Sequence, residues 1–169
     1  MVAIVLLYAF LAAFAPNFMS LANQLNILRD AAFVGIIAWG MTLVLISGEI
    51  DISVGPHVAF AGVVLASLAQ SGVPLPVAGL IVLVLGALIG CFTGMLRAFL
   101  DVPSFIVTLA LWLALRGIAQ VMSDAVPIVI MDFGFQNLGA GSVLGIPTPA
   151  VIMLVLFAVF SFVATQTVF

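Results

Sequence analysis

The chain has 169 residues, of which 66% are hydrophobic and 5% are charged, and its formal net charge is −3. Its mean hydropathy is +1.51. Soluble domains are about half apolar and about a quarter charged, so this composition indicates an all-α polytopic membrane protein embedded in a lipid bilayer. The apolar runs are continuous rather than alternating, which argues against a β-barrel. Three basic side chains are too few to support nucleic-acid binding.

Six apolar runs reach or approach the length of a membrane span, which needs about 17–25 residues. They occupy residues 2–15, 31–47, 54–71, 76–96, 104–122 and 149–164. We therefore expect about six transmembrane helices in a single transmembrane domain over residues 1–169. Polar segments at 17–30 and 97–103 are expected as loops, and 123–147 as a small extramembrane or re-entrant hairpin.

No catalytic, cofactor-binding or metal-ligating motif is visible in the sequence. The chain has no lysine and no phosphate-binding loop ending in Gly-Lys-Ser or Gly-Lys-Thr, so any ATP hydrolysis is expected on another subunit. The one histidine, His57, belongs to no catalytic triad pattern. The one cysteine, Cys91, lies inside an apolar run and is interpreted as a small buried hydrophobic residue.

Residues 48–56 form an acidic, glycine-flanked break between the second and third apolar runs. They read Gly48-Glu49-Ile50-Asp51-Ile52-Ser53-Val54-Gly55-Pro56. A carboxylate at membrane depth costs about 2.5–3.5 kcal/mol unless it faces protein or water, and the freed backbone groups also need partners. The pattern predicts a broken or re-entrant element, with Ser53 as the N-cap of the next helix and Pro56 in its first turn.

Three interpretations of Glu49 and Asp51 remain open: helix capping with interface solvation, a hinge or gate beside a solute path, and a proton or cation site. Arg116, inside the fifth run, can snorkel to an interface, pair with Asp124 or line a pore. Three glycines at four-residue spacing share one face of the fourth run and predict close packing of a neighbouring helix. They are Gly86, Gly90 and Gly94.

Residues 40–55 resemble the signature of sugar-type ABC importer permeases, the ribose, xylose and galactose branch, whose core reads Gly-Gly-Ile-Asp-Leu-Ser-Val-Gly. A second block at 102–109, Val-Pro-Ser-Phe-Ile-Val-Thr-Leu, and the later pair Arg116-Gly117 follow in the family's order. A weaker third match runs from Pro127-Ile128 to Pro147-Thr148-Pro149. The departures are Glu49 for the second glycine, Pro56 for a serine and Thr93 for an asparagine.

The resemblance extends from about residue 17 to 169 and implies a permease subunit in the bacterial inner membrane, with its N-terminus in the cytoplasm. The implied partners are a second permease copy, a cytoplasmic ABC ATPase, and a periplasmic or lipoprotein sugar-binding protein. Family members are about twice as long, so the chain is expected to be the N-terminal half of the family's domain. The residues expected in the translocation path or hinge are Gly48, Glu49, Asp51, Ser53, Gly55, Thr108 and Arg116.

Four other functions stay open. A branched-chain amino-acid ABC permease would normally lack the Ile-Asp-Ile-Ser-Val-Gly form of residues 50–55. A proton-coupled secondary transporter would use the acidic residues of the break directly. A membrane scaffold without transport activity, or an inactive truncated fragment, would fit a chain shorter than its family.

Overall fold

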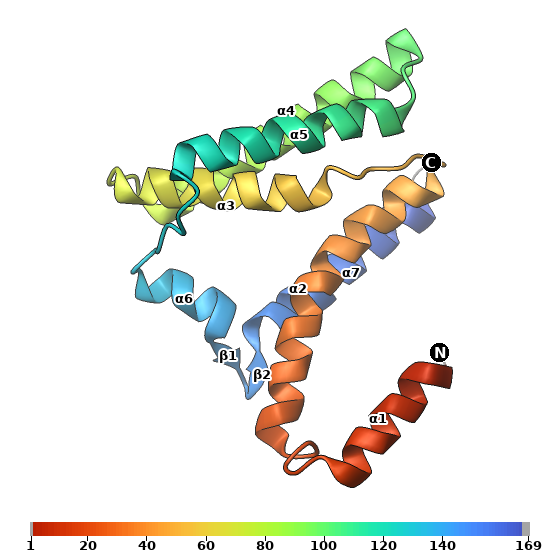
Figure 1. The fold of residues 1–169 in the computed structure, drawn as a ribbon, viewed down its shortest axis with the longest axis vertical. Coiled ribbons are helices and arrows are strands. Elements are labelled where there is room, and N and C mark those ends of the chain that lie inside the picture. The colour runs from red at the N-terminus through yellow and green to blue at the C-terminus, as the bar shows by residue number, and fades with distance from the viewer. Residues whose placement is uncertain (1, 167–169) are drawn as a thin grey trace. The chain divides into compact units, whose positions relative to one another are not determined.

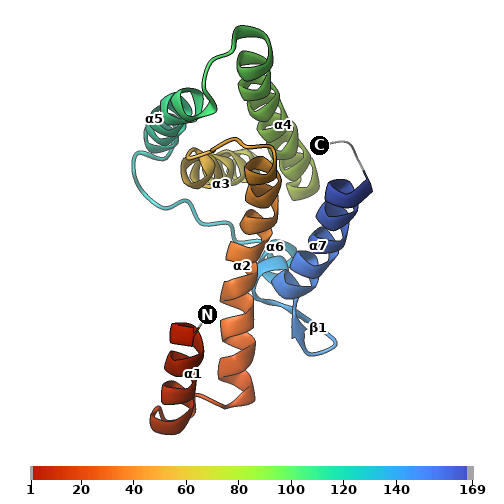
Figure 2. The same cartoon turned by 90° about the vertical axis from the view of Figure 1, so that its right-hand side faces the viewer.

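The computed structural model describes residues 2–166 and is mainly helical (Figure 1). The helices are α1 (Val2–Phe14), α2 (Leu21–Ile46), α3 (Val54–Gln70), α4 (Leu75–Leu100), α5 (Ser104–Ser123), α6 (Phe133–Ala140) and α7 (Thr148–Gln166). Strands β1 (Ser142–Val143) and β2 (Ile146–Pro147) form an antiparallel hairpin between α6 and α7 (Figure 2). The prediction of an all-α polytopic membrane protein is confirmed, and the hairpin lies within the segment where one was expected.

Four helices of the described chain, α2, α4, α5 and α7, are long and apolar enough to cross a membrane. The protein is therefore a multi-pass membrane protein, but the expected six full spans are not reached. Helices α1 and α3 are apolar but have only 13 and 17 residues. At about 1.5 Å per residue, α3 is about 25 Å long, against a hydrocarbon core of about 30 Å.

Two helix boundaries differ from the sequence prediction. Helix α2 begins at Leu21 rather than near residue 31, because the Ser20 hydroxyl accepts the Asn23 N–H at 3.3 Å and caps the first turn. Helix α4 continues to Leu100, so Arg97 lies in its last turn instead of in a polar link. A cation is favourable there because it faces the negative end of the helix dipole.

The described residues form two compact units, one of residues 2–39 and 137–166, the other of residues 40–136. The boundaries between the units fall inside α2 and α6. In the first unit, the rings of Trp39 and Phe157 lie 4.6 Å apart, and Met153 packs against Gly35. Small residues make the buried contacts, among them Ala32 and Ala150.

In the second unit, α3 packs against both α5 and α4. The buried side chains of this unit are Val64, Ala66, Ala78, Val107, Leu115 and Ala119 together with Ser53 and Thr108. Cys91 is exposed on α4, contrary to the expectation that it is buried. The outward-facing side of α4 is otherwise formed by large apolar residues such as Leu80, Leu83 and Leu88, as expected of a lipid-facing helix.

A tight turn joins α3 to α4. Gly72 has φ +85°, and its N–H donates to the Ala69 carbonyl at 3.1 Å while the Val73 N–H donates to the Leu68 carbonyl at 3.0 Å. This is the Schellman arrangement, in which a left-handed residue closes the last helical turn. Pro74 then occupies the N-cap of α4.

Candidate functional site

Helix α2 ends in a second Schellman motif at the start of the break. Gly48 has φ +78°, its N–H donates to the Leu45 carbonyl, and the Glu49 N–H donates to the Val44 carbonyl, both at 3.1 Å. Glycine suits this left-handed position because it has no Cβ to clash with the backbone. In the structure, the break comprises residues 47–53, because α2 ends at Ile46 and α3 begins at Val54. It therefore begins in a defined conformation.

Asp51 fixes the turn that leads into α3. Its Oδ1 atom accepts the backbone N–H of Ser53 at 2.7 Å and the Ser53 hydroxyl at 2.6 Å. Ser53 occupies the predicted N-cap position with φ −79° and ψ −7°, but its side chain makes no capping bond. The expectation of a Ser53 side-chain cap is therefore wrong. The geometry of Asp51 fits the capping interpretation of this carboxylate.

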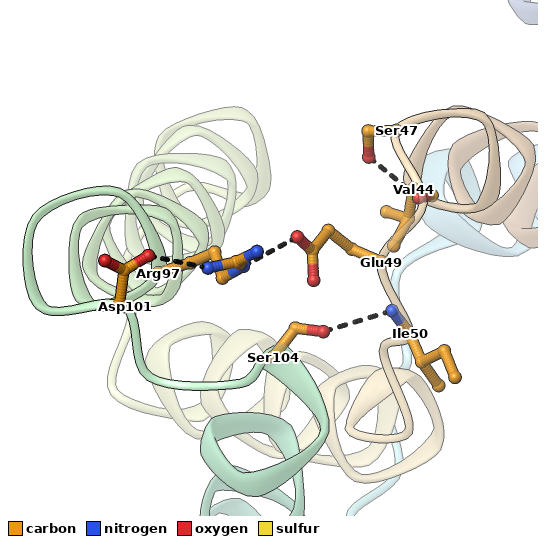
Figure 3. A network of polar contacts seen from close by, with 7 residues as sticks. All are labelled: Val44, Ser47, Glu49, Ile50, Arg97, Asp101 and Ser104. Carbon is orange, nitrogen blue, oxygen red and sulfur yellow. Dashed lines mark hydrogen bonds and ion pairs between the residues drawn. The ribbon is translucent and has the colours of Figure 1, made fainter.

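The middle of the break is bound by the first turns of α5. The Ile50 N–H donates to the Ser104 hydroxyl oxygen at 3.2 Å (Figure 3). The Thr108 hydroxyl shares its proton between the Ile50 carbonyl at 3.3 Å and the Phe105 carbonyl at 3.4 Å. Thr108 is 1% exposed. Both backbone polar groups of Ile50 thus have partners, as a break beside apolar helices requires.

An ion pair joins the break to the end of α4. Arg97 donates from Nε to Glu49 Oε1 at 2.7 Å, and its NH1 group donates to Asp101 Oδ1 at 3.1 Å (Figure 3). Hydrogen bonding to Ser104, and then to Arg97, lowers the pKa of Glu49 below its ordinary value of 4.5. The Ser104 oxygen accepts from Ile50, so its own proton is free to face the Glu49 carboxylate. Glu49 is therefore ionised at neutral pH.

These elements border a cavity of about 280 Å³. The polar residues that line it include Glu49, Asp51, Ser53, His57, Arg97 and Thr108. A second, mostly apolar cavity of about 400 Å³ lies between α3 and α4, and His57 lines both. Sequence reasoning did not identify Arg97 or Ser104 as members of this site. Ser104 lies in the 102–109 block that carries the family resemblance, and this was the available signal.

The three glycines of α4 border these cavities. Gly86 lines the apolar cavity, and Gly90 and Gly94 line the polar one. A Cβ at Gly90 or Gly94 would meet no atom within 4 Å, and one at Gly86 would meet only His57 Nε2, at 3.6 Å. Close helix packing at these glycines stays a prediction.

Three expected site residues do not line the polar cavity: Gly48, Gly55 and Arg116. Gly55 is exposed on α3. Arg116 is exposed on α5, with its guanidinium carbon 5.4 Å from the centroid of the Trp112 ring, a distance typical of a cation–π contact. Within residues 2–166, no ion pair joins Arg116 to Asp124, and no group of three or more His, Cys, Asp or Glu residues is arranged to hold a metal ion.

The family model described as "Branched-chain amino acid transport system / permease component" matches residues 23–169. The chain belongs to this permease family. A permease of this family is a transport component and not itself an enzyme. The resemblance to sugar-type ABC importer permeases is confirmed by the relatives below.

Three curated relatives of this permease family are similar over nearly all of the chain. "Probable ABC transporter permease protein YphD" of Escherichia coli (strain K12) is 53% identical over 100% of the chain and 51% of its own length. Ribose import permease protein RbsC of Haemophilus influenzae is 38% identical over 98% of the chain and 53% of its own length. L-arabinose ABC transporter permease protein AraH of Azospirillum brasilense is 38% identical over 96% of the chain and 48% of its own length.

The chain spans about half the length of these curated permeases. No solved structure shows a significant match to it.

Proposed function

We propose that this chain forms part of the membrane-spanning permease subunit of an ATP-driven ABC importer for a monosaccharide. The observation that carries the proposal is the polar cavity of about 280 Å³ bordered by the break, α4 and α5. A hydroxyl-rich solute crosses an apolar protein only where polar groups replace its water. The cavity supplies carboxylate, guanidinium, imidazole and hydroxyl groups in a chain with 5% charged residues.

The names of the relatives support a monosaccharide as the solute. Two of them are named for ribose and L-arabinose. The family description names branched-chain amino acids instead, which keeps such a permease as the second candidate. The Ile-Asp-Ile-Ser-Val-Gly form of residues 50–55 favours the sugar branch.

The break and the link between α4 and α5 lie at the same end of the second unit, because Glu49 pairs with Arg97 and Ile50 bonds to Ser104. We place this end at the cytoplasmic face of the bacterial inner membrane, with Arg97 there as the positive-inside rule prefers. With α1 crossing the membrane as well, the same assignment puts the N-terminus in the cytoplasm. The chain then acts as one transmembrane domain, with the three glycines of α4 packing against a neighbouring helix.

The proposed partners follow from the family, because relatives of the chain are named as ABC transporter permeases. In this scheme a cytoplasmic ABC ATPase supplies the energy. A second permease copy completes the pore, and an extracytoplasmic sugar-binding protein delivers the solute. ATP binding and hydrolysis shift the pore between two access states by stabilising them differently. Gly48, Gly55, Thr108 and Arg116 belong to the path or its hinge in this scheme.

The test is uptake by right-side-out membrane vesicles loaded with ATP, in which the chain is coexpressed with its ATPase and binding protein. Radiolabelled ribose, arabinose, galactose and leucine are offered separately. We expect ATP-dependent uptake of a monosaccharide that an uncoupler leaves intact. Uptake of leucine alone would favour the amino-acid permease. Uptake that survives ATP depletion and collapses with an uncoupler would favour proton coupling, and no uptake of any solute would indicate an inactive fragment.

A variant links this uptake to the break. Asp51→Asn removes the charge of the carboxylate that orders the turn before α3. If the break lies beside the path, we expect reduced uptake at unchanged expression. Unchanged uptake would leave Asp51 with a capping role alone.

A further inference from the structure

We propose that the ion pair between Glu49 and Arg97 is a releasable latch that holds the break against the end of α4 and limits water entry to the polar cavity. Nε of Arg97 and Oε1 of Glu49 are 2.7 Å apart, and both side chains line the cavity. The latch stands on these contacts. Its role in transport rests on the proposed function.

The latch joins the break to a different element from its other bonds. Ser104 and Thr108 attach Ile50 to α5, and Asp51 with Ser53 fixes the start of α3. Arg97 is the side chain of α4 that contacts Glu49. Separating Glu49 from Arg97 therefore frees the α4 side of the cavity while the break stays attached to α5.

Both charges keep a partner when the latch opens. Arg97 also donates to Asp101 Oδ1 at 3.1 Å, in its own last helical turn, and Glu49 keeps the Ser104 hydroxyl beside it. An ion pair that leaves a bare charge is costly to separate at a membrane. Here neither charge is left bare, so opening requires little work.

Solvent exposure points to the same conclusion. The side chains of Arg97 and Glu49 are 44% and 29% exposed. Such pairs are screened by water and salt, and they are weak. Asp51 and His57 also line the cavity. The Asp51 carboxylate accepts the Ser53 hydroxyl rather than pairing with Arg97. Glu49 stands where the resembling signature has glycine, so the latch is an addition to the shared motif.

The test measures the accessibility of a thiol inside the cavity, on the chain alone in lipid nanodiscs. Thr93 lines the polar cavity, and Thr93→Cys in a Cys91→Ser background places one thiol there. Labelling by a small charged methanethiosulfonate reports water access. Glu49→Gln and Arg97→Gln are each expected to raise the labelling rate about two- to fivefold, the range that fits a weak exposed pair. The swap Glu49→Arg with Arg97→Glu is expected to bring the labelling rate back toward the parent rate without reaching it, because a carboxylate at position 97 is repelled by Asp101 and by the negative end of α4.

Asp124→Asn is the matched control, because it removes one carboxylate charge at the far end of α5 from Ser104. It should leave labelling unchanged, and circular dichroism should show the parent helix content for every variant. If folded Glu49→Gln and Arg97→Gln label at the parent rate, or the swap labels as fast as the single variants, the latch is wrong. If labelling responds but no solute is taken up in the vesicle assay, the latch stands and the importer function fails.

Discussion

Thr108 donates its hydroxyl to the carbonyl oxygen of Ile50 at 3.3 Å across 58 residues of sequence. Thr108 is also the most buried polar side chain of α5, at 1% exposure. The bond connects the packed interface of α3 and α5 to the break. The conformation of the break therefore depends on the packing of α5.

Removing this hydroxyl should destabilise the chain. Thr108→Val keeps the shape of the side chain but removes its hydrogen bonding to the Ile50 and Phe105 carbonyls, and a typical hydrogen bond contributes about 0.5–1.5 kcal/mol. We expect a lower denaturant midpoint in detergent micelles, with Thr108→Ser close to the parent. Thr93→Val is the control, because Thr93 donates only within α4, to Ile89. Equal midpoints for Thr108→Val and Thr93→Val would argue against this role of the Ile50 contact.

Gly48→Ala should also destabilise the chain. Gly48 has φ +78°, and a left-handed residue with a Cβ costs about 1–2 kcal/mol. Gly40 lies in α2 two turns earlier, where a Cβ would meet no atom within 4 Å. Gly40→Ala should therefore stabilise the helix by about 0.5–1 kcal/mol. Thermal unfolding of both variants in the same detergent checks this, and shifts of the same sign would contradict it.

The pH dependence of stability should change with Glu49. Because the folded pKa of Glu49 lies below 4.5, its contribution to stability is fully present above pH 4.5 and is lost as the pH falls through the folded pKa. Glu49→Gln removes this contribution. Thermal midpoints measured from pH 7 to pH 3 should differ between parent and variant at neutral pH and converge at the acid end. A constant difference across the range would disprove this linkage.

Cys91 provides a test of the membrane placement of α4. It is exposed on the isolated chain, within a helix that is long and apolar enough to span a bilayer. In intact vesicles it should resist a membrane-impermeant maleimide added from either side, and it should react fully after solubilisation in dodecyl sulfate. Val126→Cys, in the exposed segment after α5, should react in intact vesicles when its side faces the reagent. Rapid labelling of Cys91 in intact vesicles would place it outside the bilayer.

The apolar runs of the sequence predicted the positions of most helices. Helices α3, α5 and α7 begin and end within about two residues of their expected limits. Gly72 follows the end of α3, and Pro103 and Pro147 precede the starts of α5 and α7. The early start of α2 was missed, since polar residues suggested a loop although no helix breaker lies between Ser20 and the apolar run. Arg97 was placed in a link for the same reason, although α4 ends only at its left-handed C-cap, Asp101, with φ +51°.

The candidate site was only partly predictable. Asp51, Ser53 and Thr108 could be singled out from the cost of polar groups in an apolar chain and from the resemblance. The pairing of Glu49 with Arg97 could not, because it joins two helices by side chains 48 residues apart, and periodicity carries no information on such contacts. Ser53 shows the same limit: its position was correct, but the donor role of its hydroxyl depends on the Asp51 rotamer.

The turn between α3 and α4 has a consequence for how the chain is made. Gly72 and Val73 return their N–H groups to the end of α3, so the turn brings most of its own hydrogen bonds with it. Two helices joined in this way can leave the translocon and enter the lipid as a pair. We therefore expect the 17-residue α3, which is short for a membrane crossing, to enter the bilayer together with the 26-residue α4.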